Sequence, residues 1–120
     1  MKFNSPWNGG VLASAGGLVF QGNSKQEFAA YDAGRGTELW STKVQTGVIA
    51  APITYSIKGE QYVAVLAGWG GVWVLAPGIL SEVGGPVRNI SRLLVFKLGG
   101  TARLPPEPPF SRPALNPPRP

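Results

Sequence analysis

The chain has 120 residues, with 17 Gly, 12 Pro, a formal net charge of +5, and neither Cys nor His. The absence of both residue types excludes Cys or Ser–His nucleophilic catalysis, zinc sites of the usual kind, and covalent attachment of haem within these residues. Proline makes up half of Pro105–Pro120, and it lacks an N–H and fixes φ. We therefore expect a foldable part over residues 1–104 and a Pro-rich linker or disordered tail over residues 105–120.

Short apolar runs separated by Gly, Pro, Asn and Ser recur along the foldable part, which is typical of antiparallel β-meanders. No window shows a convincing helical period of apolar residues. We expect strands at Val11–Ala15, Leu18–Gly22, Glu27–Asp32, Glu38–Lys43, Ala51–Ile57, Gln61–Ala67, Val72–Ala76 and Leu93–Leu98. The chain is therefore predicted to be all-β.

One stretch between Glu60 and Glu82 carries no charge and is long enough to span a bilayer. Gly68–Gly71 interrupts its centre and Pro77-Gly78 lies near its end, while both halves are rich in Val and aromatic residues. This pattern favours two buried strands around a turn, so we predict no transmembrane segment. No long apolar run follows Met1, so we expect no signal peptide in this chain.

Positive charge is concentrated after Gly78, where six Lys or Arg stand against two Glu. A basic segment can bind nucleic acid through its phosphates. Here the charges are spaced singly, with no cluster and no pattern of stacking aromatics around them. We therefore predict a solvated basic linker and no nucleic-acid partner.

A shift of about 45 residues lays the chain on itself, with Leu18-Val19-Phe20 on Val63-Ala64-Val65. A period of about 40–50 residues with several strands each is typical of β-propeller blades. The first blade is predicted to cover Val11–Lys43. The second begins at Ala51 and takes Leu93–Leu98 as its third strand or as an edge strand. Two blades close no ring, so the chain is expected to be a piece of a larger propeller.

Several ordered motifs resemble one enzyme family, and together they cover most of the chain. The pieces are PWNGGVLASAGGLVFQGNSKQEFAAYDA, TELW, QTGVIAAPITY and GEQYVAVLAGWGGVW. They resemble the last blades of alcohol dehydrogenases that use pyrroloquinoline quinone (PQQ). The later SRLLVFKLGGTARLPP is similar to the last strand and the linker to a cytochrome c domain in the quinohaemoprotein subgroup. The resemblance implies the last two blades of an eight-bladed β-propeller, followed by a Pro-rich tail.

The blades of that family share a tryptophan-docking motif, which reads AYDAGRGTELW here and ends at Trp40. We expect Asp32 to hydrogen-bond the turn, Gly36 to adopt positive φ, and Trp40 to pack against the neighbouring blade. Arg35 replaces the Thr of the motif, which removes a hydroxyl. Gln26 stands where the family usually has Gly, so strain is expected in that turn.

The resemblance implies a cofactor pocket at one end of the propeller, near its central axis. Loops that precede a first strand and loops that join second and third strands lie at that end. The candidate PQQ contacts are therefore Trp7, Asn8, Trp69, Gly71 and Val72. A glycine-rich turn lets backbone approach a planar ligand closely. Packing and strand entry are the alternative roles for these residues.

The resemblance also implies a general-base carboxylate and a calcium or lanthanide ion on the PQQ, but Glu27, Asp32, Glu38 and Glu60 match neither. We therefore expect no catalytic or metal-binding residue and no activity from this chain alone. The intact enzyme would oxidise primary alcohols to aldehydes in the periplasm and pass electrons to a cytochrome, with haem c in a downstream domain. The alternative is a non-catalytic β-propeller-like module that binds a protein partner through its open blade faces.

Overall fold

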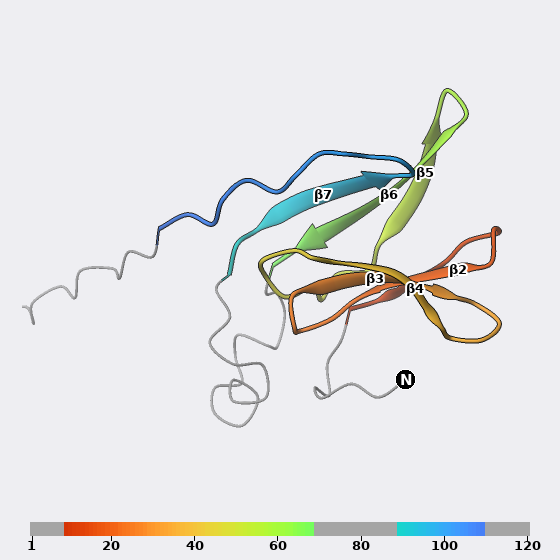
Figure 1. Cartoon of the computed structure of the whole chain (residues 1–120), viewed down its shortest axis with the longest axis horizontal. Coiled ribbons are helices and arrows are strands. Elements are labelled where there is room, and N and C mark those ends of the chain that lie inside the picture. The colour runs from red at the N-terminus through yellow and green to blue at the C-terminus, as the bar shows by residue number, and fades with distance from the viewer. Residues whose placement is uncertain (1–8, 69–88, 110–120) are drawn as a thin grey trace, which may run out of the picture.

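A computed structural model describes residues 9–68 and 89–109, which form two antiparallel β-sheets packed face to face (Figure 1). The first sheet has four strands and the second has three, and both keep the order of the sequence. The strands are β1 (Val11–Ala13), β2 (Leu18–Gly22), β3 (Glu27–Asp32), β4 (Glu38–Lys43), β5 (Ile53–Ile57), β6 (Glu60–Ala67) and β7 (Arg92–Lys97). Residues 9–68 and 89–109 contain no helix that is long and apolar enough to cross a membrane.

The predicted strands are confirmed wherever the structure describes them. The bounds of β2, β3 and β4 match the prediction, those of β1, β5 and β6 differ by one or two residues at one end, and those of β7 differ by one residue at each end. The predicted first blade is the four-stranded sheet, and β7 pairs with β6 as the third strand of the second sheet. The strand expected at Val72–Ala76 lies outside the described residues.

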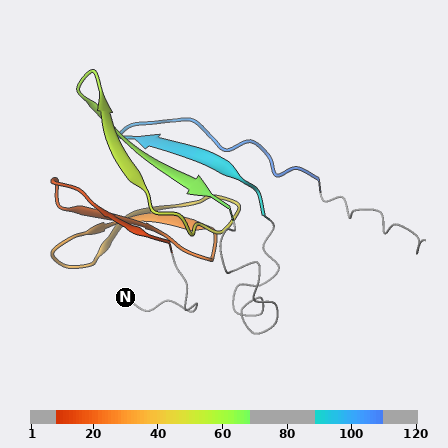
Figure 2. The ribbon, with the colours of Figure 1, turned by 180° about the vertical axis from the view of Figure 1, so that it is seen from behind.

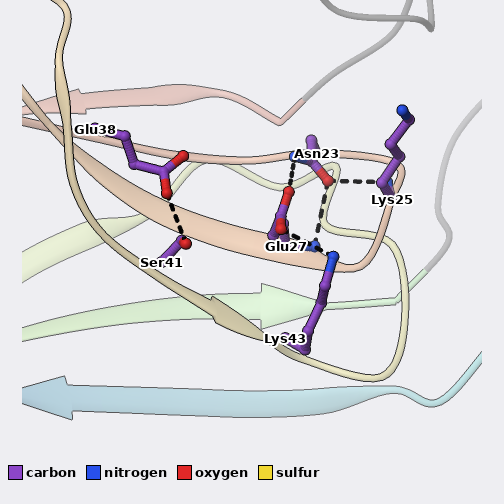
Figure 3. Close-up of polar contacts among 6 residues, drawn as sticks. All are labelled: Asn23, Lys25, Glu27, Glu38, Ser41 and Lys43. Carbon is purple, nitrogen blue, oxygen red and sulfur yellow. Dashed lines mark hydrogen bonds and ion pairs between the residues drawn. The ribbon is translucent and has the colours of Figure 1, made fainter.

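Short polar turns join the strands as their residue types demand. Between β2 and β3, Asn23 Oδ1 accepts hydrogen bonds from the N–H groups of Lys25 (2.9 Å) and Glu27 (3.2 Å), as Figure 3 shows. Gln26 has φ of +66°, so the strain expected from a side chain at this position is present. Between β5 and β6, Lys58 and Gly59 both have positive φ, which is the geometry of a two-residue hairpin turn.

The tryptophan-docking motif has the predicted geometry. Asp32 Oδ1 accepts hydrogen bonds from the N–H groups of Gly34 (3.0 Å) and Arg35 (2.8 Å), and Gly36 has φ of +69°. This turn carries the chain into β4, where Trp40 meets the ring of Phe96 in β7 edge to face, with centroids 5.4 Å apart. Trp40 therefore packs against the neighbouring sheet, as expected.

The core lies between the two sheets. Its centre is Phe28, which is fully buried and stacks on Phe20 of its own sheet and on Phe96 of the other, at centroid distances of 6.2 and 5.2 Å. The second sheet contributes Val63, Val65 and Leu94. Alternation along each strand places these residues on the two faces that meet. Ala29, Tyr31 and Ala64, on the opposite faces, are buried as well.

The shift of about 45 residues places β2 on β6, but its residue-by-residue superposition is wrong. A shift of 45 superposes Phe20 on Val65, yet these two residues face each other across the core from opposite sheets. Equivalent residues of successive blades point the same way around a propeller, so they cannot face each other. A shift that is wrong by one residue exchanges the two faces of a strand, and this explains the error.

Candidate cofactor site

The five predicted cofactor contacts, Trp7, Asn8, Trp69, Gly71 and Val72, lie outside the described residues. The structure does describe the residues next to them, Gly9 at one end and Gly68 at the other. The positions of these two glycines show where the predicted loops join the fold.

Gly9 and Gly68 both lie against the segment around Val48, which links the two sheets. The Gly9 N–H donates to the Gly22 carbonyl (3.0 Å), and the Val48 N–H donates to the Asn23 carbonyl (3.0 Å). On the other side, Val48 forms a parallel bridge with Gly68. The attachment points of the two predicted loops therefore meet at one place, although they belong to different sheets.

The place where the segments at Gly9, Gly22 and Gly68 meet Val48 is here called the crossing at Val48. Glycine is required there because the backbones approach each other closely. A Cβ on Gly9 would stand 2.8 Å from the Val48 carbonyl oxygen and 2.9 Å from that of Gly22. A Cβ on Gly22 would stand inside van der Waals contact of the Val48 side chain, which is fully buried. The local sequence thus makes room for three segments to cross.

Polar side chains surround Gly68, which has φ of +138°. A Cβ there would lie 3.2 Å from Asn89 Oδ1 and 3.3 Å from Ser91 Oγ. Arg92 follows, paired with Ala67, and its buried Nη1 has no hydrogen-bond partner within residues 9–68 and 89–109. An unpaired guanidinium N–H in this position is a donor suited to an anionic oxygen.

Sequence reasoning missed Arg92, which it counted only as one of the positive charges of the basic segment. The signal was present in the alternation of β7, since Arg92 shares the core-facing positions of that strand with Leu94 and Phe96. A charged residue at the start of a core-facing row is unusual unless it is paired. That alternation, and not the net charge, was the informative pattern.

The carboxylates in the first sheet form surface pairs. Lys43 Nζ donates to Glu27 Oε1 at 2.8 Å, and Asn23 Nδ2 donates to Glu27 Oε2 at 3.3 Å (Figure 3). The hydrogen bond from Lys43 is the main cause that lowers the pKa of Glu27 below its usual 4.5. Glu38 accepts a hydrogen bond from Ser41 Oγ at 2.8 Å. A carboxylate held ionised by a lysine is poorly suited to be a general base, because its lowered pKa weakens its affinity for a proton.

The second sheet carries a similar exposed pair. Lys97 Nζ lies 3.1 Å from Glu60 Oε1, and the Tyr62 hydroxyl donates to Glu60 Oε2 at 3.0 Å. The hydrogen bond from Lys97 is the largest cause that lowers the pKa of Glu60. Across residues 9–68 and 89–109, no three Asp, Glu, His or Cys residues gather where they could hold a metal ion.

Comparison with known proteins places the chain in a family. The family model described as PQQ glucose/ethanol/alcohol dehydrogenase, β-propeller domain, matches residues 1–63. The quinohemoprotein alcohol dehydrogenase ADH IIB of Pseudomonas putida is 48% identical over 109 residues, which are 91% of this chain and 16% of that relative. The 1-butanol dehydrogenase (cytochrome c) of Thauera butanivorans is 46% identical over 84% of this chain and 14% of its own length.

A solved structure agrees with this assignment. The quinohemoprotein alcohol dehydrogenase ADHIIG from Pseudomonas putida superposes with a TM-score of 0.77 at 45% identity, over 88% of this chain and 15% of that one. The chain therefore spans only a small part of the length of its relatives. By these matches, the chain belongs to the family of PQQ-dependent glucose, ethanol and alcohol dehydrogenases and forms part of their β-propeller.

Proposed function

We propose that this chain supplies the last two blades of an eight-bladed PQQ-dependent alcohol dehydrogenase, over residues 1–104, with residues 105–120 as a Pro-rich linker. The intact enzyme oxidises primary alcohols to aldehydes and passes the electrons to a cytochrome. The names of the relatives, quinohemoprotein alcohol dehydrogenase and 1-butanol dehydrogenase (cytochrome c), support this reaction. Haem c in another domain, a calcium or lanthanide ion bound by other blades, and a periplasmic location belong to the same proposal.

The observation that carries the proposal is the crossing at Val48. Gly9 and Gly68, the described residues next to the two predicted loops, both lie against Val48 there. This supports a site to which Trp7, Asn8, Trp69, Gly71 and Val72 contribute together. These residues are proposed to form one wall of the PQQ pocket, with the indoles against the flat rings and the glycine allowing close backbone approach. When bound, PQQ supplies the electron acceptor for alcohol oxidation.

The chemistry of the described residues fits this cofactor. PQQ is a planar quinone that carries carboxylates, and an anionic oxygen is a suitable partner for the buried Nη1 of Arg92, which has none among the residues that the structure describes. The role proposed for this chain is to bind and orient the cofactor and to exclude water from one side of it. The proton-accepting carboxylate is proposed to come from another part of the intact enzyme.

Titration of the chain with PQQ, followed by tryptophan fluorescence, tests the pocket. We expect quenching that is reduced in Trp69→Phe and in Trp7→Phe, and retained in the matched control Trp40→Phe, since Trp40 packs against Phe96. Quenching that neither Trp7→Phe nor Trp69→Phe changes would refute the pocket. Dye-linked alcohol oxidation with added PQQ and calcium is expected to show no turnover by the chain alone.

A second candidate function is a module that binds a protein partner and no cofactor. The observation in its favour is the face of the second sheet that points away from the first. Six large apolar side chains on that face are exposed: Ile53, Tyr55, Ile57, Leu66, Leu93 and Val95. An apolar face of this kind marks an interaction surface. This candidate predicts no PQQ-dependent quenching, so the same titration separates the two functions.

A further inference from the structure

The segment that joins the two sheets contacts the second sheet through two consecutive residues, Thr46 and Gly47. The Gly68 N–H donates to the Gly47 carbonyl at 2.8 Å. The Ile90 N–H donates to Thr46 Oγ1 at 3.3 Å, although the two residues are 44 positions apart in the sequence. In Figures 1 and 2 this segment, which follows β4, passes the arrowhead of β6 and the start of β7. One dipeptide therefore holds both the residue that follows β6 and a residue that precedes β7.

These two hydrogen bonds lie beyond the end of the ladder between β6 and β7. The paired residues of that ladder end at Ala67 and Arg92, so neither Gly68 nor Ile90 belongs to it. A Cβ on Gly68 would nevertheless stand 3.4 Å from Ser91 Cα, which places the two backbones side by side. The contacts with the joining segment thus hold the two chains together where the ladder between them has ended.

The hydroxyl of Thr46 is the part of this arrangement that an apolar side chain of similar shape would not supply. Thr46 is fully buried, and Ile90 is buried as well. A buried N–H that loses its acceptor costs more free energy than an ordinary hydrogen bond contributes, because no water replaces the lost partner. Valine at position 46 would keep most of the shape and remove the acceptor of the Ile90 N–H. The hydrogen bond, and not packing alone, therefore accounts for threonine at this position.

The residues held in this way are polar residues of the candidate cofactor site. Asn89 and Ser91 are the sequence neighbours of Ile90. A Cβ on Gly68 would lie 3.2 Å from Asn89 Oδ1 and 3.3 Å from Ser91 Oγ, so both side chains border that glycine. A movement of Ile90 relative to Gly68 would carry both neighbours with it.

We propose that Thr46 is a positioning residue for the candidate cofactor site. Its hydroxyl fixes Ile90 and thereby holds Asn89 and Ser91 against Gly68, while the carbonyl of the next residue fixes Gly68 itself. Thr46 acts through the backbone of Ile90 and not by contact with the cofactor. The consequence for cofactor affinity rests on the function proposed above, whereas the positioning of the two chains does not.

Amide hydrogen exchange of the full chain, measured by NMR, tests the positioning without a cofactor. In Thr46→Val we expect the Ile90 amide to exchange at least about tenfold faster, relative to the core amides of Phe28 and Val65, and the Gly68 amide to exchange faster as well. Thr46→Ser keeps a hydroxyl and is expected to stay within about threefold of the unmodified chain. If Thr46→Val does not fold, Thr46→Cys takes its place, because a thiol is a weaker acceptor than a hydroxyl.

The matched control is Thr54→Val, which removes a hydroxyl that donates to the Tyr62 carbonyl at 2.9 Å in the same sheet. It is expected to leave the exchange of the Ile90 amide unchanged. An unchanged rate at Ile90 in the folded Thr46 variant overturns the proposal. An equal rise at Ile90 and at the core amides overturns it too, because that result shows a general loss of stability and no local positioning.

Titration of the same variants with PQQ, followed by tryptophan fluorescence, measures the consequence for the site. Under conditions in which every variant is folded, we expect the Kd for PQQ to rise about tenfold in Thr46→Val and to stay within about threefold in Thr46→Ser and Thr54→Val. An unchanged Kd in Thr46→Val, with faster exchange at Ile90, overturns the role in the cofactor site. If the unmodified chain does not bind PQQ, the proposed function fails, and hydrogen exchange still decides whether Thr46 positions the two chains.

Discussion

Gly22→Ala is the sharpest test of the packing between the two sheets. Gly22 is the buried last residue of β2, and an added methyl would overlap the Cβ and Cγ1 of Val48 and stand 3.2 Å from its Cγ2. Val48 has no room to retreat, because it is fully buried and its N–H is bonded to the Asn23 carbonyl at 3.0 Å. Overpacking costs about 1–3 kcal/mol. We expect about 3 kcal/mol here, because no rotamer change moves a Cβ.

Such a loss would lower the midpoint of thermal unfolding by roughly 12 °C or more, taking about 4–8 °C per kcal/mol for a small domain. Urea and thermal unfolding of the purified chain, followed by tryptophan fluorescence, measure it. The matched control is Gly16→Ala, where the nearest atom to an added Cβ is Ser14 Oγ at 3.9 Å. That variant should stay within about 0.5 kcal/mol of the unmodified chain. Equal midpoints for the two variants would refute the reasoning.

Three further outcomes are expected. Gln26→Gly should raise the free energy of unfolding, measured in urea, by about 1 kcal/mol, because Gln26 has φ of +66°, and Gln26→Val should lower it. Glu27→Gln should cost about 0.5 kcal/mol at neutral pH, because the pair with Lys43 is exposed. The pKa of Glu27 is lowered in the folded chain, so this stability is present above pH 4.5 and is lost as the pH falls through the folded pKa. Urea unfolding curves of the unmodified chain and of Glu27→Gln, near pH 7 and at about pH 2, measure the difference in unfolding free energy at each pH. Trp40→Ala should lower the free energy of unfolding, measured by thermal unfolding, by about 2 kcal/mol, and Trp40→Phe should lower it less. Equal losses in the two variants would contradict a role for the contact with Phe96.

The strands and turns were predictable because their signals are local. Asn23 and Asp32 bond backbone N–H groups within a few residues of themselves, so residue type and spacing were enough to place both turns. The register of the repeat was not predictable in the same way. Phe20 and Val65 are both apolar, and only the pairing of strands shows that they face each other.

The candidate site was predictable only through family resemblance, and its five residues remain predictions. The crossing at Val48 depends on contacts between segments far apart in sequence, and nothing in the local pattern around Gly22 indicates that a valine side chain fills the space beside it. Arg92 was missed for a related reason. A count of charges does not tell which face of a strand each charge occupies.

The crossing at Val48 has a consequence for how the chain folds. Val48 closes contacts with Gly22 and Asn23 of the first sheet and with Gly68 beyond β6, so the ends of both sheets are tied to one residue. Contacts between distant segments require long loops to close before they yield stability, which slows folding. The contacts of Val48 with both sheets form only when the two sheets are in place. We therefore expect the two sheets to unfold in a single cooperative transition and not as separate units.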